Sequence, residues 1–565
     1  MISYFESTRQ QIADGIAAAF DKARQSGALA PDAVVAPFVV EVPADTAKGD
    51  FATNAAMANA RTLRLPPPKI AQLVLEGFDT AGTDVERMEV AGPGFINFFM
   101  KPAFFGKLLA EVLEKKERYG CSDYGKGKKV MVEYVSANPT GPMHMGNARG
   151  GAIGDVLAEL LEWSGHDTTR EFYVNDAGNQ IEKFGISLEA RYLQQLRGED
   201  AVPFPEDGYH GADITDHAIA FIAEYGDKYL DCDSATRRQA LVDYALPKNI
   251  DGLKNDLARY RINYDVWFRE SALHPDAINQ VIQLLRDREM VYEQEGAVWY
   301  KATQFGADKD EVLVRQNGHP TYFAADIAYH YNKFAVRGFD KVINIWGADH
   351  HGHVARLKGA MDAVGLDGSK LDIVLMQLVR LMKDGEPYRM SKRSGKAITL
   401  SDLLVEVPLD AARFFFIMRE PGSALDFDLD LAVEESAKNP VFYVQYAHAR
   451  ICSMIKNLAV KYGAVARPVT VEQMAVLNTT EERELIRKLG QFPGLIVEAA
   501  ASYDPAAVSS YLSEVATHFH KFYTTCQLKS ESDEILYPRL ALCDAARTVL
   551  RNGLALLKIS APNIM

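Results

Sequence analysis

The chain has 565 residues, of which 48% are hydrophobic and 24% charged, and its formal net charge is −14. This length exceeds one ordinary hydrophobic core, so three or four domains are expected, and the composition is typical of a soluble globular protein. The acidic balance argues against a strongly basic nucleic-acid-binding protein, and the sequence has no run of about twenty apolar residues that would span a membrane.

The N-terminal region predicts a small α+β domain over residues 1–115. Its first twenty residues are typical of an amphipathic helix and not of a signal peptide, because no basic run precedes the apolar part. Later, a Gly92-Pro93-Gly94 turn precedes a strand-like run. The five cysteines are widely spaced without a Cys-x-x-Cys pair, which favours reduced thiols in a cytoplasm over disulfides or structural zinc.

Residues 125–405 predict an α/β domain with a parallel sheet. The first strand is expected at Val130–Val135, a short, apolar and β-branched run. A helix-like run follows and ends at Gly165. Strand-like runs then alternate with helical segments, which indicates crossover helices. A long stretch over about 180–295 is mostly helical and is interpreted as an insertion into this domain.

From residue 406 to residue 565 the strong patterns are helical, so a helical C-terminal domain is expected. Basic residues slightly outnumber acidic ones from Val441 onward, although the chain as a whole is acidic. A neutral or basic region on an acidic protein is compatible with local contact with nucleic acid. Ordinary fluctuation of charge along the chain explains the same observation.

A Gly- and Pro-rich stretch, VSANPTGPMHMGNARGG, occupies Val135–Gly151 between the first predicted strand and its helix. In open α/β sheets, ligands bind beyond the carboxyl ends of the strands and near a helix N-terminus. Small residues there let phosphates approach backbone N–H groups, and His144 can donate a hydrogen bond to phosphate oxygens. A proline-rich turn with an incidental histidine is the structural alternative.

A second stretch, RMSKRSGKAITLSDLL, spans Arg389–Leu404 and places four basic residues within eight positions. Gly385 and Gly395 bracket it, so it could close lysines over a triphosphate. An exposed basic loop without function is the alternative. The common nucleotide motifs GxxxxGK[ST] and GxGxxG are absent at the positions where they would operate.

The pairing of a His-x-Gly-Asn loop with a Met-Ser-Lys loop about 250 residues later resembles the class I aminoacyl-tRNA synthetases, and in detail the bacterial type of arginyl-tRNA synthetase. Further stretches resemble that family in the same order, namely GDFATNAAMANAR, GPGFINFF, YVNDAGNQ, FAADIAYH, WGADHHGH, FFFIMREPGSALDFDLDLA and SAPNIM. The resemblance covers nearly the whole chain. It implies a Rossmann-like catalytic domain over 125–405, flanked by a tRNA-elbow-binding domain over 1–115 and an anticodon-binding domain over 406–565.

The reaction implied by the resemblance is ATP-dependent ligation of L-arginine to its tRNA through arginyl-adenylate, with release of pyrophosphate and AMP. ATP would arrive with Mg²⁺, no tightly held metal is expected, and the enzyme would be a cytoplasmic monomer without membrane contact. Two other functions remain open. A nucleotidylyltransferase can share the His-x-Gly-His loop but needs no large helical C-terminal domain, and a non-catalytic tRNA-binding paralogue would not need the catalytic residues.

The resemblance also implies which residues contact ATP. They are Pro142, His144, Gly146, Asn147, Gly347, Asp349, Met390, Ser391 and Lys392. Three of them, His144, Asn147 and Lys392, are expected to act on the phosphates. Asn147 stands where many relatives carry a second histidine, and its amide still offers a neutral N–H donor. Arg389 and Arg393 depart from the Lys-Met-Ser-Lys-Ser signature of the family.

For arginine, the resemblance implies Glu133, Ser136, Asn138, Tyr322, Asp326 and His350. Glu133, Asp326 and Tyr322 would hold the guanidinium group. Ser136, Asn138 and His350 would lie near the α-amino and carboxylate end. Glu133 also interrupts an apolar strand, and an unpaired buried carboxylate is costly, so a cationic partner is expected. A protein arginine such as Arg149 is the structural alternative to the substrate.

Three further features lead to weaker expectations. The histidines of HHGH (His350, His351, His353) lack a nearby cysteine or paired carboxylate motif, so packing or contact with ATP is favoured over zinc. Asp410-Ala411-Ala412-Arg413 replaces the family's Asp-Ala-Leu-Arg, at an expected cost in packing. Phe442, Tyr443, Tyr446, His448 and Arg450 suit stacking on unpaired bases, although most of the aromatic rings are expected in the core.

Overall fold

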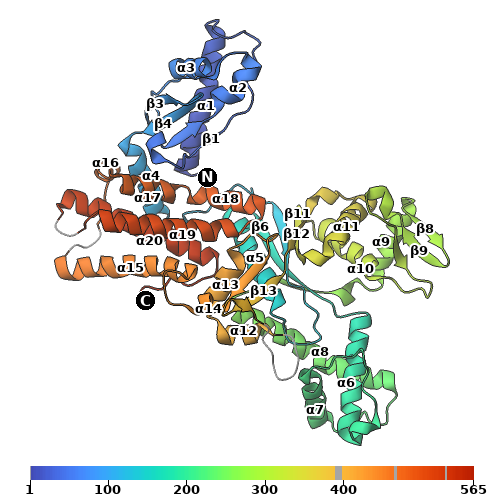
Figure 1. Cartoon of the computed structure of the whole chain (residues 1–565). Coiled ribbons are helices and arrows are strands. Elements are labelled where there is room, and N and C mark those ends of the chain that lie inside the picture. Colours follow the sequence, from blue (N-terminus) through green and yellow to red (C-terminus); the bar gives the residue numbers. More distant parts are fainter. Residues whose placement is uncertain (1, 389–397, 464–466, 529–530) are drawn as a thin grey trace. The chain divides into compact units, whose positions relative to one another are not determined.

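The computed structural model describes residues 2–388, 398–463, 467–528 and 531–565 (Figure 1). The chain forms two compact units. Unit 1 contains Met1–Tyr124, Pro440–Ala499 and Ala507–Met565, and unit 2 contains Gly125–Asn439 with Ala500–Ala506. A search of the described residues for a helix with the length and apolar character needed to cross a bilayer gave none.

Unit 2 is built on a five-stranded sheet whose strands are all parallel. Its order is β12-β11-β5-β6-β7, formed by Leu371–Met376, Lys341–Gly347, Lys129–Glu133, Asp167–Val174 and Val266–Arg269. The chain therefore builds outward from β5 through β6 and β7, and then crosses to the other side of β5 to add β11 and β12. This doubly wound order confirms the predicted Rossmann-like fold, and its switch point lies between β5 and β11.

Helix α5 (Gly146–Trp163) follows β5 and has buried residues on all its faces, as expected for a helix in the middle of a large unit. Gly154 permits this close packing, because a Cβ atom there would lie 2.2 Å from the ring of Tyr134. The helix ends before Gly165, which has a φ of 88°. This confirms the predicted strand–loop–helix order at the start of the sheet.

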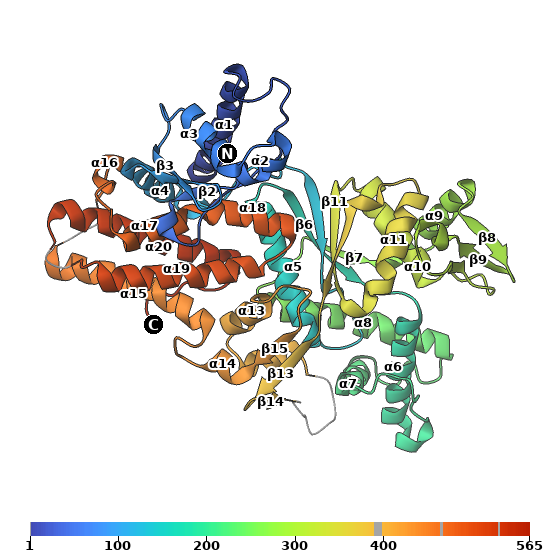
Figure 2. The ribbon, with the colours of Figure 1, turned by 45° about the horizontal axis from the view of Figure 1, so that its top comes forward.

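The stretch predicted as a helical insertion is more mixed than expected. Helices α6 (Asn179–Arg197), α7 (Ala212–Tyr225) and α8 (Ser234–Arg259) do follow β6 and form a cluster beside the sheet (Figure 2). The prediction is wrong for Val266–Arg269, which is β7 and pairs with β6. The sequence of β7, Val-Trp-Phe-Arg, has only four residues and no alternation of polar and apolar side chains, so it gave no strand signal.

The segment between β7 and β11 contains α9 (Asp276–Asp287), an antiparallel sheet and α10. The sheet has the order β10-β9-β8, from Glu311–Val314, Ala297–Tyr300 and Val291–Gln294. Helix α10 (Tyr322–Tyr331) continues into a π-helical turn at Asn332–Val336, and α11 (His351–Ala363) follows β11. Helices α10 and α11 pack against one another.

Unit 2 ends with α12 (Leu400–Glu406), α13 (Leu409–Ile417), β15 (Leu425–Asp428) and α14 (Leu429–Val433). Strand β15 pairs with β13 (Val379–Lys383), and β14 (Glu386–Pro387) lies on the other edge of β13. The expectation of helix alone after residue 406 is therefore wrong at Leu425–Asp428. These four residues do alternate, with Leu425 and Phe427 buried, but the run is too short to stand out between helices.

A buried ion pair ties α13 to α5. The Arg413 guanidinium, with no exposed surface, lies 2.6 Å from the Asp155 carboxylate and also donates to the carbonyl oxygen of Tyr260. Arg413, the last residue of the Asp-Ala-Ala-Arg run, thus lies inside unit 2, where it joins two helices far apart in sequence.

Unit 1 combines both ends of the chain. Its N-terminal part contains α1 (Tyr4–Gln25), β1 (Val40–Glu41), β2 (Phe51–Thr53), α2 (Ala55–Leu63), α3 (Pro67–Gly77), β3 (Val85–Ala91), β4 (Phe95–Met100) and α4 (Pro102–Lys115). Its C-terminal part contains α15 (Pro440–Tyr462), α16 (Val471–Met474), α17 (Thr480–Gly490), α18 (Phe492–Ser502), α19 (Ala506–Thr525) and α20 (Asp533–Leu556). Helix α4 contacts α16, α17 and α20.

Candidate functional site

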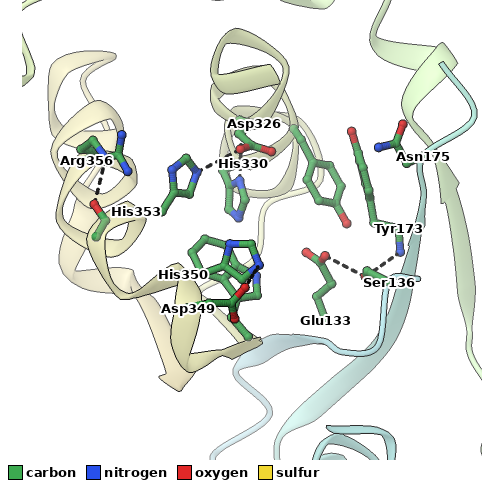
Figure 3. A pocket seen from close by; sticks show the side chains of 13 residues that line it. Glu133, Ser136, Tyr173, Asn175, Asp326, His330, Asp349, His350, His353 and Arg356 are labelled. Carbon is green, nitrogen blue, oxygen red and sulfur yellow. Dashed lines mark hydrogen bonds and ion pairs between the residues drawn. The ribbon is translucent and has the colours of Figure 1, made fainter. Parts of the chain in front are cut away.

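A pocket of about 490 Å³ opens beyond the carboxyl ends of β5, β6 and β11 (Figure 3). It is lined by Glu133, Ser136, Tyr173, Asn175, Asp326, Tyr329, His330, Trp346, Asp349, His350, Gly352, His353 and Arg356. The volume is that of a small-molecule site, and the position is the topological switch point at which α/β sheets bind ligands.

Five of the residues expected at a substrate site line this pocket, namely Glu133, Ser136, Asp326, Asp349 and His350. Of the other lining residues, His353 was expected in packing or contact with ATP, and the rest were not predicted. Tyr173 and Asn175 come from the end of β6, and Trp346 comes from the end of β11. Since parallel strands end at one edge of a sheet, the ends of the predicted strands could have identified these three.

Glu133 is only 7% exposed, and its expected cationic partner is a protein lysine. One carboxylate oxygen lies 2.5 Å from the ammonium group of Lys333, and the other accepts a hydrogen bond of 2.9 Å from the Ser136 hydroxyl. The alternative prediction, that Arg149 is the partner of Glu133, is wrong. Its guanidinium group donates instead to the carbonyl oxygens of Gln377 and Glu420.

Asp326 faces the pocket from α10, and Glu133 faces it from the end of β5 (Figure 3). The Asp326 carboxylate lies 3.0 Å from Nε2 of His353 on α11. This part of the pocket wall therefore presents two carboxylates, one beside an ammonium group and one beside an imidazole. Such a wall attracts a cationic group and can accept several N–H bonds from it.

The backbone is strained where the chain leaves β5. Val135 has a φ of 71° and Ser136 a φ of 42°, and a β-branched residue such as Val135 seldom adopts this conformation. The turn directs the Ser136 hydroxyl back to Glu133, and the same oxygen accepts a hydrogen bond from the Tyr173 N–H at 3.1 Å. Strain of this kind accumulates at ligand sites, where the surrounding contacts hold it in place.

The loop of His144 lies at the N-terminus of α5. Its Nδ1 accepts a hydrogen bond of 2.9 Å from the Gly146 N–H, so a neutral imidazole carries its proton on Nε2 and can donate from its exposed side. Position 146 needs glycine, because a Cβ atom there would lie 2.9 Å from that Nδ1. Asn147 lies half-buried in the first turn of α5, where the helix dipole favours anions.

The second predicted loop is tied to the first by its last residues. Thr399 forms a β-bridge with His144, the Met145 N–H donates to Ile398, and the Leu400 N–H donates to Met143. The chain immediately after residue 397 is thus held against the His144 loop. Met390, Ser391 and Lys392 themselves lie outside the described residues, as do Arg389 and Arg393.

Several other predicted residues do not line the pocket. Asn138 and Pro142 are exposed in the loop after β5. Tyr322 is 46% exposed at the start of α10, one helical turn before Asp326. Gly347 ends β11, and a Cβ atom there would lie 2.4 Å from the Asp349 carboxylate.

The aromatic residues at the start of α15 are less buried than expected. The helix packs through Val441, Val444 and Ala447, each at most 3% exposed, whereas Tyr446 is 39% exposed. The helical spacing of these small apolar residues turns the larger rings away from the core. Phe442 stacks on Tyr446 at 6.2 Å. The expectation that most of these rings are core residues is therefore wrong.

Comparison with known proteins gives matches along the whole chain. The arginyl tRNA synthetase N terminal domain matches residues 8–100, the catalytic domain of tRNA synthetases class I (R) matches 108–451, and the DALR anticodon binding domain matches 444–565. The chain is 52% identical to the Arginine–tRNA ligase of Acetivibrio thermocellus, with 100% of both chains covered. It is 51% identical to that of Ruminiclostridium cellulolyticum, with 99% of both covered.

Among solved structures, the arginyl-tRNA synthetase of Thermus thermophilus resembles this chain with a TM-score of 0.75. The alignment covers 99% of this chain and 100% of the other at 22% identity. At that identity the structural match supports the fold.

Proposed function

We infer that L-arginine and ATP react in the pocket beyond β5 and β11 to form arginyl-adenylate, because the chain belongs to the arginine–tRNA ligase family and charges tRNA with arginine. Pyrophosphate leaves in this step, and AMP leaves when the arginyl group passes to the 3′-terminal adenosine of the tRNA. The observation that carries the proposal is that the acidic pocket and the His144 loop both lie where β5 ends, at the carboxyl edge of the sheet.

The acidic wall is the proposed site for the side chain of arginine. Asp326 and Glu133 accept N–H bonds from the guanidinium group, and Tyr322 assists from one turn earlier on α10. Ser136, Asn138 and His350 contact the α-amino and carboxylate end of arginine. A planar guanidinium offers five donors in a fixed fork, which suits two carboxylates on a rigid wall.

The loop after β5 is the proposed phosphate site. His144 donates from Nε2, Asn147 donates from its amide, and Pro142 and Gly146 let ATP approach the N-terminus of α5. Gly347 and Asp349, at the end of β11, contact the adenosine, with Asp349 on the ribose hydroxyls. Met390, Ser391 and Lys392 complete the phosphate site, and Mg²⁺ accompanies ATP as part of the substrate complex.

The protein has little covalent chemistry to perform in adenylate formation. The α-phosphate is attacked by the arginine carboxylate, and negative charge grows on the departing pyrophosphate. Alignment of the two substrates and donors aimed at the phosphate oxygens therefore account for most of the catalysis. The carboxylates of the pocket wall fix the arginine, and the helix N-terminus with His144 fixes the phosphates.

The remaining partners follow from the same family. We propose that residues 1–115 bind the tRNA elbow and that residues 406–565 bind the anticodon. The partly exposed rings at the start of α15 are candidates for stacking on unpaired bases. All five cysteines lie unpaired, which supports a reducing cytoplasm. A monomer is proposed from the family alone.

ATP–pyrophosphate exchange, measured with arginine and tRNA present, tests the proposed function. Arginine-dependent exchange is expected. A nucleotidylyltransferase would not depend on arginine, and a non-catalytic tRNA-binding protein would bind tRNA without any exchange. Either result would contradict the proposal.

Lys392→Ala should slow exchange by roughly 10²–10³-fold, the scale for removing one group that stabilises charge in a transition state. Arginine affinity should change little, because this loop is proposed to contact phosphates. Lys370→Ala is a matched control, since Lys370 is exposed before β12, at the opposite end of that strand from the pocket. A collapse of arginine binding with exchange chemistry intact would reassign the loop.

A further inference from the structure

A chain of hydrogen bonds runs behind the pocket and joins two of the residues that supply its carboxylates, Glu133 and Asp326. His330 donates from Nδ1 to the backbone oxygen of Asp326 at 2.8 Å. The Asn344 amide donates to Nε2 of His330 at 2.8 Å. The Lys333 ammonium group donates to the Asn344 oxygen at 3.3 Å and to Glu133 at 2.5 Å.

The chemistry of the groups in this chain fixes the directions of its hydrogen bonds. The backbone oxygen of Asp326 can only accept, which places the proton of His330 on Nδ1 and leaves Nε2 to accept from Asn344. Burial and the neighbouring charge of Lys333 hold the pKa of His330 well below its usual value, so the imidazole is neutral. A buried hydrogen-bonded network of this kind restricts the orientation of its members.

Lys333 is the charged member of the network, and it is completely buried. It lies in the π-helical turn Asn332–Val336 that follows α10, and its ammonium nitrogen is 4.0 Å from the centre of the Tyr329 ring. π-Helical turns are rare and often occur at functional sites. Burying a lysine costs free energy unless it is paired, so Lys333 requires Glu133 as its counter-ion, just as Glu133 requires a cation.

The two carboxylates of the wall therefore differ. The charge of Glu133 is balanced by a fixed cation, and its second oxygen is held by Ser136. Asp326 has His353 as its partner, which is charged only when protonated. A cationic substrate thus contacts Glu133, whose charge is already neutralised by Lys333, and Asp326, whose charge the substrate itself can neutralise.

We propose that Lys333 is a positioning residue that sets specificity for arginine, a proposal that rests on the proposed function of the pocket. It holds the Glu133 carboxylate in one orientation and, through Asn344 and His330, at a fixed distance from the Asp326 turn of α10. The spacing of the two acceptors then matches the planar fork of a guanidinium group and not the single point charge of an ammonium group. Lys333 itself touches no substrate.

The test is steady-state exchange with the full-length chain and Lys333→Met. The arginine KM should rise by about 10- to 100-fold, the scale seen when the partner that orients a ligand-binding side chain is removed. The ATP KM should change by less than about threefold, because the phosphate loop does not belong to the network. Lys341→Met is the matched control, since Lys341 pairs with Asp372 at the opposite end of β11, and its arginine KM should remain unchanged.

Glu133→Gln/Lys333→Met keeps the test decisive if the single variant folds poorly, because the pair is removed without leaving a buried charge. The double variant should fold, and its arginine KM should be no higher than that of Glu133→Gln alone, because Lys333 acts through Glu133 and the two substitutions are strongly non-additive. An unchanged arginine KM in either variant would overturn the inference, as would equal increases for arginine and ATP. If Asp326→Asn also left arginine use unaffected, the proposed function of the pocket would itself fail, so the two failures are distinguishable.

Discussion

Citrulline should be used roughly 10⁴–10⁵-fold less efficiently than arginine, although the two amino acids have almost the same size. Citrulline is neutral and has a carbonyl oxygen where the guanidinium group has N–H donors. That oxygen would face the Asp326 carboxylate, and acceptors built to receive N–H bonds would remain unpaired. Sites with such mismatched polar groups discriminate on this scale, whereas a missing methylene in an apolar pocket gives only about 10–200-fold.

The measurement is kcat/KM in tRNA charging for both amino acids, with wild-type chain and with Asp326→Asn. The substitution should weaken arginine use by about 2–5 kcal/mol, as expected when one side of a buried charged contact is removed. Lysine should also be rejected, because one ammonium group cannot satisfy two carboxylates with a planar fork. Comparable use of citrulline and arginine by the wild type would mean that other residues hold the guanidinium group.

Arg413→Met should destabilise unit 2 by about 3–5 kcal/mol. Asp155 is 2% exposed and Arg413 fully buried, so the substitution removes the nearer cation of a buried carboxylate between α5 and α13. The other Asp155 oxygen keeps the Arg170 guanidinium at 4.0 Å, and breaking the close buried pair costs this much. All four tryptophans lie in unit 2, so their fluorescence during denaturant unfolding reports on this unit.

Arg380→Met is the control for that measurement. Arg380 pairs with Asp426 by two hydrogen bonds, but the two side chains are 67% and 50% exposed. Exposed pairs contribute about 0–1 kcal/mol, so the unfolding midpoint should barely move. Equal effects of the two arginine substitutions would show that burial of the Asp155 pair does not govern its contribution.

The sequence alone was sufficient for the parts of the fold with strong periodicity. β5 is a β-branched apolar run and α5 a long apolar helix ended by a glycine, so the strand, the loop that follows it and the helix were predictable. β7 and β15 have four residues each, too few for a period to appear. Their identity as strands depends on neighbours such as β6 and β13, which supply the hydrogen-bonding edge.

The site was predictable in part for a similar reason. Glu133 stood out as a carboxylate in an apolar strand, and the need for a cation followed from the cost of burying it. The identity of that cation did not, because Lys333 lies 200 residues away in sequence and in a segment, YHYNKFAVRGF, that looks like an ordinary amphipathic helix end. The π-helical turn directs this lysine into the protein core, and no local sequence pattern predicts such a turn.

Unit 1 is formed by segments from both ends of the chain, and this has a consequence for folding during synthesis on the ribosome. Helix α4 buries Phe105 and Leu108 completely, and it contacts helices that begin beyond residue 470. At about 5–20 residues per second, those helices emerge tens of seconds after α4, when unit 2 has already been translated. The nascent chain therefore carries one apolar face of α4 without its native cover for most of its synthesis, and a premature stop before α15 yields a product that cannot bury that face.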